Sequence, residues 1–469
     1  MSTDVAAAAE ETARLKQYKN TAKHEDMRRR RTECSVEIRK QKRDDLMMKR
    51  RNLVEEEDDG SSPDPLAEQS MDGTVSTTTS SRGPPKFSLD EVLRILMNSP
   101  TVEQMQDAFE SLRKSLSKSR NPPVDEVINM GLVPALIAAF EFPDDKVQFE
   151  AAWALTNIVS GTSQQTMFAV EQGCTPPLVR LTCHENLALA EQALWALANI
   201  AGESAQMRDY IIASGGVEAM MSLAAKVSTL TESFARTIAW AFSNMCRHKN
   251  PHAPLPVLTV LAQGLTVLIA HQDKTVRQDA CWALSYLTDG PDAQIQVALD
   301  TGVMPTIVGF LRESESLVAP ALRVLGNMAT GSDDLTQKVI DLGTLNELPH
   351  VVKRAKSSSV VKECCWLISN VIAGTQLQIQ AVIDASLLPL LVDVAKGGDY
   401  KCQFEVSWAL ANLAQGGTAT QQLELVDEGA LGGLCALLHL RHNDLLTNAL
   451  ETMHSLLTTV STQYVFLGT

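Results

Sequence analysis

From Phe87 onward, apolar residues recur three or four positions apart, which is the spacing of one face of an α-helix. Glycines interrupt this pattern at intervals of 42, 42, 87, 41 and 86 residues, at Gly131, Gly173, Gly215, Gly302, Gly343 and Gly429. A proline stands three residues after some of these glycines, at Pro134, Pro176 and Pro305. Because glycine favours a helix end and proline a helix start, the pattern predicts an all-α chain of short helices.

The tryptophans keep the same period. Successive gaps are 42, 45, 42, 84 and 42 residues, for Trp153, Trp195, Trp240, Trp282, Trp366 and Trp408. The long gap is a repeat in which Arg323 takes the tryptophan position. The residue four positions later is Asn in six repeats of seven, and Tyr286 in the other. A period of 40 to 47 residues in a helical chain indicates a HEAT or armadillo solenoid. We count about nine repeats over residues 88–460, forming a right-handed superhelix with atypical terminal repeats.

Helix geometry places the Trp and the Asn four residues later on one face, about 40° apart. The positions two and five residues after each Trp lie at about 200° and 140°, and all fourteen of these residues are apolar. The apolar positions therefore mark the core face, and the Trp/Asn face is expected to be exposed along one side of the solenoid. The alternative is an Asn ladder that only braces neighbouring repeats.

An exposed Trp/Asn face suits an extended basic peptide. Asn amides carry a donor and an acceptor for a peptide backbone, and Trp rings attract the cationic ends of Lys and Arg. Acidic residues near the ladder would receive the charge: Glu203, Asp279, Asp289, Asp333, Glu363 and Glu405. Tyr286 and Arg323 interrupt the ladder, so the sequence predicts two separate Trp/Asn sites, in repeats two to four and seven to eight.

Charge is unevenly distributed. Residues 14–51 hold 15 Lys or Arg and 6 Asp or Glu, a net of +9, whereas the whole chain of 469 residues has a net charge of −15. The two parts are expected to attract each other. Residues 55–87 begin with five acids and continue rich in Ser, Thr, Gly and Pro, so we expect a disordered linker. A run such as Arg28–Arg31 could also bind nucleic acid, but no aromatic stacking platform accompanies it.

Other classes of protein find little support in the sequence. No apolar run approaches a membrane span, and the N-terminus lacks the features of a secretory signal. The nine cysteines form no CxxC pair, and six of them are expected to be buried thiols: Cys174, Cys246, Cys281, Cys364, Cys365 and Cys435. No nucleotide-binding or hydrolase motif is present, so we expect no enzyme and no cofactor. His248 and His252 are four residues apart, but the sequence between them predicts a polar connector and no metal site.

The chain resembles the importin alpha family, the adaptors that recognise nuclear localisation signals. The resemblance extends from Arg14 to about Val460 and rests on segments such as QFEAAWALTNIVSGT at 148–162, AWAFSNMCRHKNP at 239–251 and SWALANLAQGG at 407–417. It implies a disordered N-terminus at 1–13, an importin beta-binding domain at 14–54, armadillo repeats at 88–460 and a short tail at 461–469. It also implies that the protein shuttles between cytoplasm and nucleus. The cluster Lys49-Arg50-Arg51 resembles the ligand expected for the groove, and residues 53–87 form a tether that reaches it, so we expect the basic domain to occupy the groove in the absence of importin beta.

The resemblance also implies the binding residues. A major signal site would comprise Trp153, Asn157, Gly161, Thr166, Gln192, Trp195, Asn199, Glu203, Trp240, Asn244, Arg247, Asp279, Trp282 and Tyr286. A minor site would comprise Arg323, Asn327, Thr330, Asp333, Glu363, Trp366, Asn370, Glu405, Trp408 and Asn412. Importin beta binding and autoinhibition would use Arg14, Lys16, Arg28, Arg29, Arg30, Arg31, Arg39, Lys40, Lys49, Arg50 and Arg51.

Two departures from the family pattern are visible. Glu203 stands where the family usually has Asp, with a modest expected effect on the lysine contact. The tenth repeat and acidic tail used by the nuclear exporter are not found before Thr469, so we expect recycling by that exporter to be affected. The main alternative is a catenin-type armadillo scaffold for adhesion or transcription, whose groove is basic and takes acidic peptides. The acidic body and the Trp ladder favour a basic ligand instead.

Overall fold

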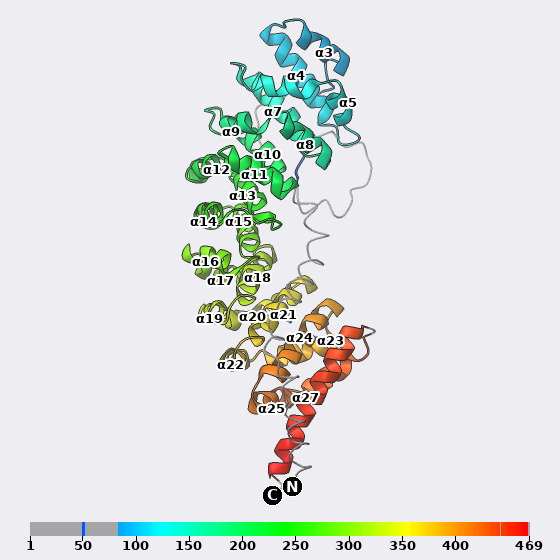
Figure 1. Cartoon of the computed structure of the whole chain (residues 1–469), viewed down its shortest axis with the longest axis vertical. Coiled ribbons are helices and arrows are strands. Elements are labelled where there is room, and N and C mark those ends of the chain that lie inside the picture. The colour runs from blue at the N-terminus through cyan, green and yellow to red at the C-terminus, as the bar shows by residue number, and fades with distance from the viewer. Residues whose placement is uncertain (1–48, 52–82, 441, 468–469) are drawn as a thin grey trace, which may run out of the picture. The chain divides into compact units, whose positions relative to one another are not determined.

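The computed structural model describes residues 49–51, 83–440 and 442–467. Every element of regular structure in these ranges is a helix, which confirms the all-α prediction. The described residues belong to two compact units, one within 44–303 and the other within 304–469 (Figure 1). The predicted disordered N-terminus, most of the basic domain and most of the linker lie outside the described residues.

In the unit within 44–303, most repeats consist of two short helices followed by a longer third one. The first repeat has two helices, and the fifth lacks the first helix. The elements are α3 (Leu89–Met97), α4 (Val102–Leu116), α5 (Val124–Asn129), α6 (Leu132–Ala139), α7 (Asp145–Val159), α8 (Ser163–Glu171), α9 (Thr175–Leu181), α10 (Leu187–Glu203), α11 (Ala205–Ala213), α12 (Gly216–Ala224), the 3-10 helix η1 (Val227–Thr229), α13 (Glu232–Arg247), α14 (Leu255–Ile269), α15 (Lys274–Leu287) and α16 (Asp292–Asp300).

The unit within 304–469 repeats the same pattern. Its elements are α17 (Met304–Phe310), α18 (Glu315–Ala329), α19 (Asp333–Asp341), α20 (Thr344–Arg354), α21 (Ser358–Ile372), α22 (Gln376–Asp384), α23 (Leu388–Gly397), α24 (Tyr400–Gly416), α25 (Ala419–Asp427), α26 (Ala430–Leu437) and α27 (Asn443–Leu467). The described helices thus form nine sets, as the period predicted. Helix α27 continues past the predicted boundary at residue 460, so the described part of the tail is helical.

The glycine signal has a backbone cause. Gly131, Gly173, Gly215, Gly302, Gly343 and Gly429 all have φ between 70° and 87°, the left-handed region that ends one helix before the next begins. The series has two double intervals. In the one from Gly343 to Gly429, Ser386 adopts φ 55° and makes the same turn between α22 and α23. The double interval from Gly343 to Gly429 therefore contains one complete repeat whose turn has no glycine.

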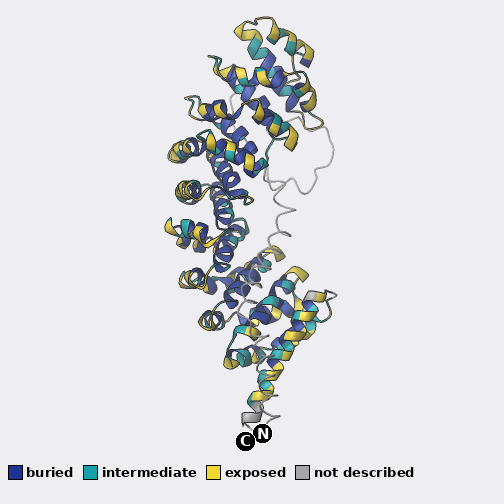
Figure 2. Ribbon diagram, viewed as in Figure 1, coloured by how far each residue is buried: buried dark blue, intermediate teal, exposed yellow. Residues whose placement is uncertain are grey.

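The core follows the predicted face of the third helices. All fourteen residues two and five positions after the Trp register are at most 1% exposed: Leu155, Leu197, Phe242, Leu284, Leu325, Ile368, Leu410, Ile158, Ile200, Met245, Leu287, Met328, Val371 and Leu413. Figure 2 shows buried residues where the helices of each unit meet and exposed residues on their outer edges. The prediction for Cys435 is wrong, because this residue of α26 is exposed, whereas the other five thiols named above are buried.

Within the described ranges, no single helix is long and apolar enough to cross a membrane. The pair α22 and α23, bent by 79°, passes such a test only on combined length and composition.

Candidate functional site

The Asn side chains of the ladder connect consecutive repeats. Asn157 Nδ2 donates to Ser117 Oγ (3.0 Å), and Asn199 Nδ2 donates to the carbonyl of Thr156 (3.3 Å). Asn244 Nδ2 donates to the Ala198 carbonyl at 2.8 Å, so in three successive repeats the Asn amide bonds the preceding repeat. In the other unit, Asn412 bonds the Ser369 carbonyl in the same way, at 2.9 Å. The bracing role, which sequence analysis gave as the alternative, is therefore real.

The Trp/Asn face was predicted to be exposed, and this prediction is wrong because most of its side chains are buried. All six ladder Asn residues are buried. Trp153, Trp240 and Trp366 are buried too, and the other three tryptophans are only half-buried. One cause is close stacking of the repeats, because some of the rings pack against a neighbouring repeat. The rings of Trp195 and Trp240, for example, meet edge to face with centroids 6.2 Å apart.

Each buried tryptophan of the ladder has an arginine over its ring. The distance from the guanidinium carbon to the ring centroid is 4.5 Å for Arg113 over Trp153 and 5.8 Å for Arg323 over Trp366. The third cation, Arg50, lies 4.6 Å from the centroid of Trp240 and comes from the described segment 49–51. These three rings thus each carry a cation, and part of their burial is due to the arginines themselves.

Lys49 lies at the C-terminal ends of α7 and α10. Its ammonium donates to the carbonyl of Gly161 (3.0 Å) and to Thr166 Oγ1 (2.9 Å), and it forms an ion pair with Glu203. The Thr166 hydroxyl lies 3.0 Å from the Val159 carbonyl, to which it donates, so a lone pair faces the lysine. Three acceptors around one ammonium match a compact, strongly hydrated point charge such as lysine.

The backbone and the side chain of Arg50 are bound separately. Its N–H donates to Asn199 Oδ1 (2.8 Å), while its carbonyl accepts from Trp195 Nε1 (2.8 Å) and Asn199 Nδ2 (3.0 Å). The guanidinium lies over Trp240 and donates to Asp279 Oδ2 at 3.3 Å. These contacts hold the backbone of Arg50 in one register, and the Asn199 amide acts there as both donor and acceptor.

Burial and Arg50 act in opposite directions on Asp279. The carboxyl group is 2% exposed, and burial raises its pKa above the ordinary value of 3.8. The positive charge of Arg50 and its hydrogen bond lower the pKa of Asp279, as does Arg247 more weakly. A cation at this position therefore stabilises the ionised form of a buried acid.

Arg51 extends the bound segment to the first repeat. Its guanidinium donates to the carbonyl of Leu116, 2.6 Å away, at the end of α4. The sequence did not identify this contact, because a backbone carbonyl at a helix end has no side-chain signature.

The remaining residues of the predicted major site line the same side of this unit. Gln192 is buried and donates to Thr156 Oγ1 (2.7 Å), so it braces neighbouring repeats. Arg247 lies 5.1 Å from the centroid of Tyr286, whose ring stacks on Trp282 with centroids 6.2 Å apart. Of the predicted basic residues, Lys49, Arg50 and Arg51 are described; Arg14, Lys16, Arg28, Arg29, Arg30, Arg31, Arg39 and Lys40 lie outside the described residues.

In the other unit, the residues of the predicted minor site lie at the corresponding positions. Arg323, which interrupts the ladder and would repel a basic side chain, forms a two-point ion pair with Glu363, at 3.1 and 3.0 Å, so its charge is partly neutralised. Thr330 Oγ1 donates to the Asn327 carbonyl (2.7 Å), and Trp408 meets Phe404 edge to face with centroids 6.5 Å apart. The other predicted members are placed on α19, α21 and α24: Asp333, Trp366, Asn370, Glu405 and Asn412.

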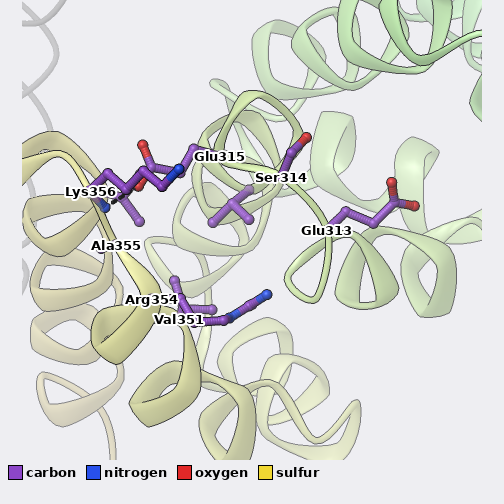
Figure 3. A pocket seen from close by; sticks show the side chains of 9 residues that line it. Glu313, Ser314, Glu315, Val351, Arg354, Ala355 and Lys356 are labelled. Carbon is purple, nitrogen blue, oxygen red and sulfur yellow. Dashed lines mark hydrogen bonds between the residues drawn. The ribbon is translucent and has the colours of Figure 1, made fainter.

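A separate pocket of about 300 Å³ lies between the ends of α17 and α18 and those of α20 and α21 (Figure 3). Its rim brings Lys356 and Glu315 together, with Arg354 on the α20 side. Of the predicted binding residues that the structure describes, none lines it. Within the described ranges, no group of His, Cys, Asp or Glu could hold a metal ion.

Comparison with known proteins agrees with this geometry. Residues 14–109 match the family "Importin beta binding domain". Residues 120–160, 162–202, 332–373 and 375–415 match "Armadillo/beta-catenin-like repeat". Importin subunit alpha-2 of Caenorhabditis elegans is 56% identical over 360 residues, which cover 77% of this chain and 67% of that protein. The chain belongs to the importin alpha family.

More distant importin alpha proteins match over larger shares of the chain. Importin subunit alpha-3 of Arabidopsis thaliana is 36% identical over 96% of this importin alpha and 82% of its own length. A solved engineered protein has a TM-score of 0.58 at 24% identity and covers 78% of this chain and 98% of its own, a likeness in fold alone. The repeats are therefore of the armadillo class. Because importin alpha proteins are nuclear import adaptors, family membership favours this function over the catenin-type alternative.

Proposed function

We propose that this importin alpha binds Lys/Arg-rich nuclear localisation signals at two sites and that its own residues 49–51 compete for the first of them. The first site comprises the major-site residues given above, around Trp195, Asn199 and Trp240. The second comprises the predicted minor-site residues, around Trp366 and Trp408. As an adaptor, the protein links its cargo to importin beta, and residues 14–54 provide that link.

The observation that carries the proposal is the bound segment itself. A basic cluster lies with its backbone hydrogen-bonded to Trp195 and Asn199, its lysine against Glu203 and its arginine over Trp240. A cargo peptide with the same Lys-Arg order can make the same contacts, since they involve only backbone atoms and cationic side chains. Occupation by the chain's own segment supports competition with cargo, because both need the same acceptors.

Importin beta would relieve this competition. If it binds residues 14–54, it draws Lys49 and Arg50 away from the groove and leaves the acceptors free. Cargo and importin beta then raise each other's affinity, because binding of either favours the same open state. Such an adaptor meets cargo in the cytoplasm and releases it in the nucleus, so it shuttles between the two compartments.

The test uses the full chain carrying Lys49→Ala and Arg50→Ala. A fluorescent peptide containing one Lys-Arg-Arg cluster should bind and raise the anisotropy, whereas a peptide with the three cations replaced by Glu should not. Addition of importin beta should then yield a ternary complex on size-exclusion chromatography. Equal binding of both peptides, or of neither, would contradict the proposed groove.

A further inference from the structure

The connector between α13 and α14 differs from the other repeat junctions because the fifth repeat has no first helix. It contains His248 and His252, for which the sequence predicts a polar connector and no metal site. In the part of the chain that the structure describes, no metal-binding group includes them. The ring of His248 is directed instead toward the preceding repeat.

His248 caps the end of α10. Its Nε2 lies 3.1 Å from both the Ala201 and the Gly202 carbonyl oxygens. Carbonyls only accept hydrogen bonds, so Nε2 carries the proton. These are last-turn carbonyls, which have no N–H partner within the helix. Burial, followed by the charge of Arg247, lowers the pKa of His248 below 6.5, which favours the neutral ring at neutral pH.

A buried arginine holds the connector in place. The guanidinium of Arg208, on α11, is fully buried. It donates to the carbonyls of His248 (2.7 Å) and Pro251 (3.1 Å), and its Nε donates to Asp209 (2.9 Å). Since two of these contacts are to connector backbone, Arg208 fixes the position from which the His248 ring reaches α10.

The next residue after the capped carbonyls is Glu203, the acid that pairs with Lys49. On its other side, Ser204 Oγ accepts from the backbone N–H of Met207 (3.2 Å) and so begins α11. The backbone of Glu203 is therefore held between the cap by His248 and the start of the next helix. The direction of its carboxylate depends on both.

We propose that His248 is a positioning residue for lysine recognition: through the Ala201 and Gly202 carbonyls it holds Glu203 against the ligand's lysine. The inference rests on the proposed function, because the lysine subsite is the one that cargo would use. It predicts energetic coupling between His248 and one ligand side chain, which a general effect on folding would not produce.

The experiment starts from the full chain with Lys49→Ala and Arg50→Ala, so that the groove is free. Two peptides are compared by fluorescence anisotropy, one with a Lys-Arg-Arg cluster and one with Ala-Arg-Arg. The variants are His248→Leu, which removes the donor, and His248→Gln, which keeps an amide N–H. His184→Leu is the matched control, because His184 precedes α10 and lies about 25 Å from the lysine subsite along the 17-residue helix.

Loss of one neutral hydrogen-bond donor should weaken the Lys-Arg-Arg peptide about three- to ten-fold in His248→Leu. The Ala-Arg-Arg peptide should be unaffected, His248→Gln should recover most of the loss, and the control should bind like its parent. A loss of equal factor for both peptides, or no loss, would overturn the positioning role. Failure of the parent chain to bind either peptide would instead count against the proposed function.

Discussion

The Arg50 guanidinium lies 4.6 Å from the ring centroid of Trp240, and this ring is only 1% exposed. A tryptophan of the binding ladder is thus covered by a cation from the chain's own basic segment. The contact is exchangeable in principle, because segment 49–51 belongs to no helix, whereas Arg113 over Trp153 is part of α4.

Replacing Lys49 and Arg50 together by Ala should tighten binding of a single-cluster basic peptide several-fold. The tethered segment is present at an effective concentration of about millimolar, so even weak binding occupies the site much of the time. The gain should shrink at high salt, because the competing contact joins a basic segment to an acidic body. Anisotropy titrations at low and high salt measure both effects. Lys118→Ala with Arg120→Ala, two exposed cations after α4, removes the same charge and should leave affinity unchanged.

The Trp195→Phe variant distinguishes the contribution of the Trp195 hydrogen bond to peptide binding from that of its aromatic ring. The variant keeps an aromatic ring beside Trp240 but loses the Nε1–H that donates to the Arg50 carbonyl at 2.8 Å. Peptide binding should weaken by about 0.5–1.5 kcal/mol in the chain with the free groove, with little change in thermal midpoint. Calorimetric titration and a melting curve are sufficient. A large drop in stability with unchanged affinity would mean that Trp195 is only a packing residue.

Binding of arginine next to Asp279 should depend on pH. Burial raises the pKa of Asp279 from 3.8, and a bound cation lowers it, so the cation binds the ionised form more tightly. Affinity should be full above the pKa of the empty site and fall as the pH drops through it, earlier than for an ordinary Asp. Asp279→Asn should cost about 1.5–3 kcal/mol at neutral pH and flatten this part of the profile. An unchanged pH profile in the variant would assign the titration to another acid.

Gly326→Ala should destabilise the unit within 304–469. An added Cβ would lie 2.1 Å from Trp366 Cζ3, so the ring or the helix must shift. We expect a loss of about 1–3 kcal/mol in the free energy of unfolding, and weaker binding at the predicted minor site. Gly309→Ala in α17 is the control, since a Cβ there meets nothing within 4 Å. Denaturant unfolding of the two variants should separate them clearly.

Much of the fold could be predicted because equivalent positions of each repeat pack in the same way. The apolar positions two and five residues after the Trp register can only face the core, and they do. Gly343 and Gly429 recur because the turn between two short helices needs a left-handed residue. The signal fails where another residue tolerates that conformation, as Ser386 does at φ 55°.

The burial of the ladder could not be derived from one helix. A helical wheel shows that Trp240 and Asn244 point away from their own core, but not that the neighbouring repeat covers them. Asn244 reaches the Ala198 carbonyl, a backbone atom with no sequence signature. The role of His248 was missed for the same reason, since its partners are also backbone carbonyls.

Arg113 is fixed over Trp153 by more than its ring contact. Its side chain is 1% exposed and forms a buried, two-point ion pair with Glu150, at 2.7 and 3.3 Å. Separating the partners of a buried ion pair leaves an uncompensated charge and costs free energy, so Arg113 is held over the ring. The face of the Trp153 ring that Arg113 covers is therefore closed to an incoming cation. A basic chain shifted by one repeat toward α4 cannot place a cation on that face. The first repeat thus limits how far a basic ligand can extend toward α4. The number of ladder tryptophans is therefore larger than the number of rings available to the cations of a ligand.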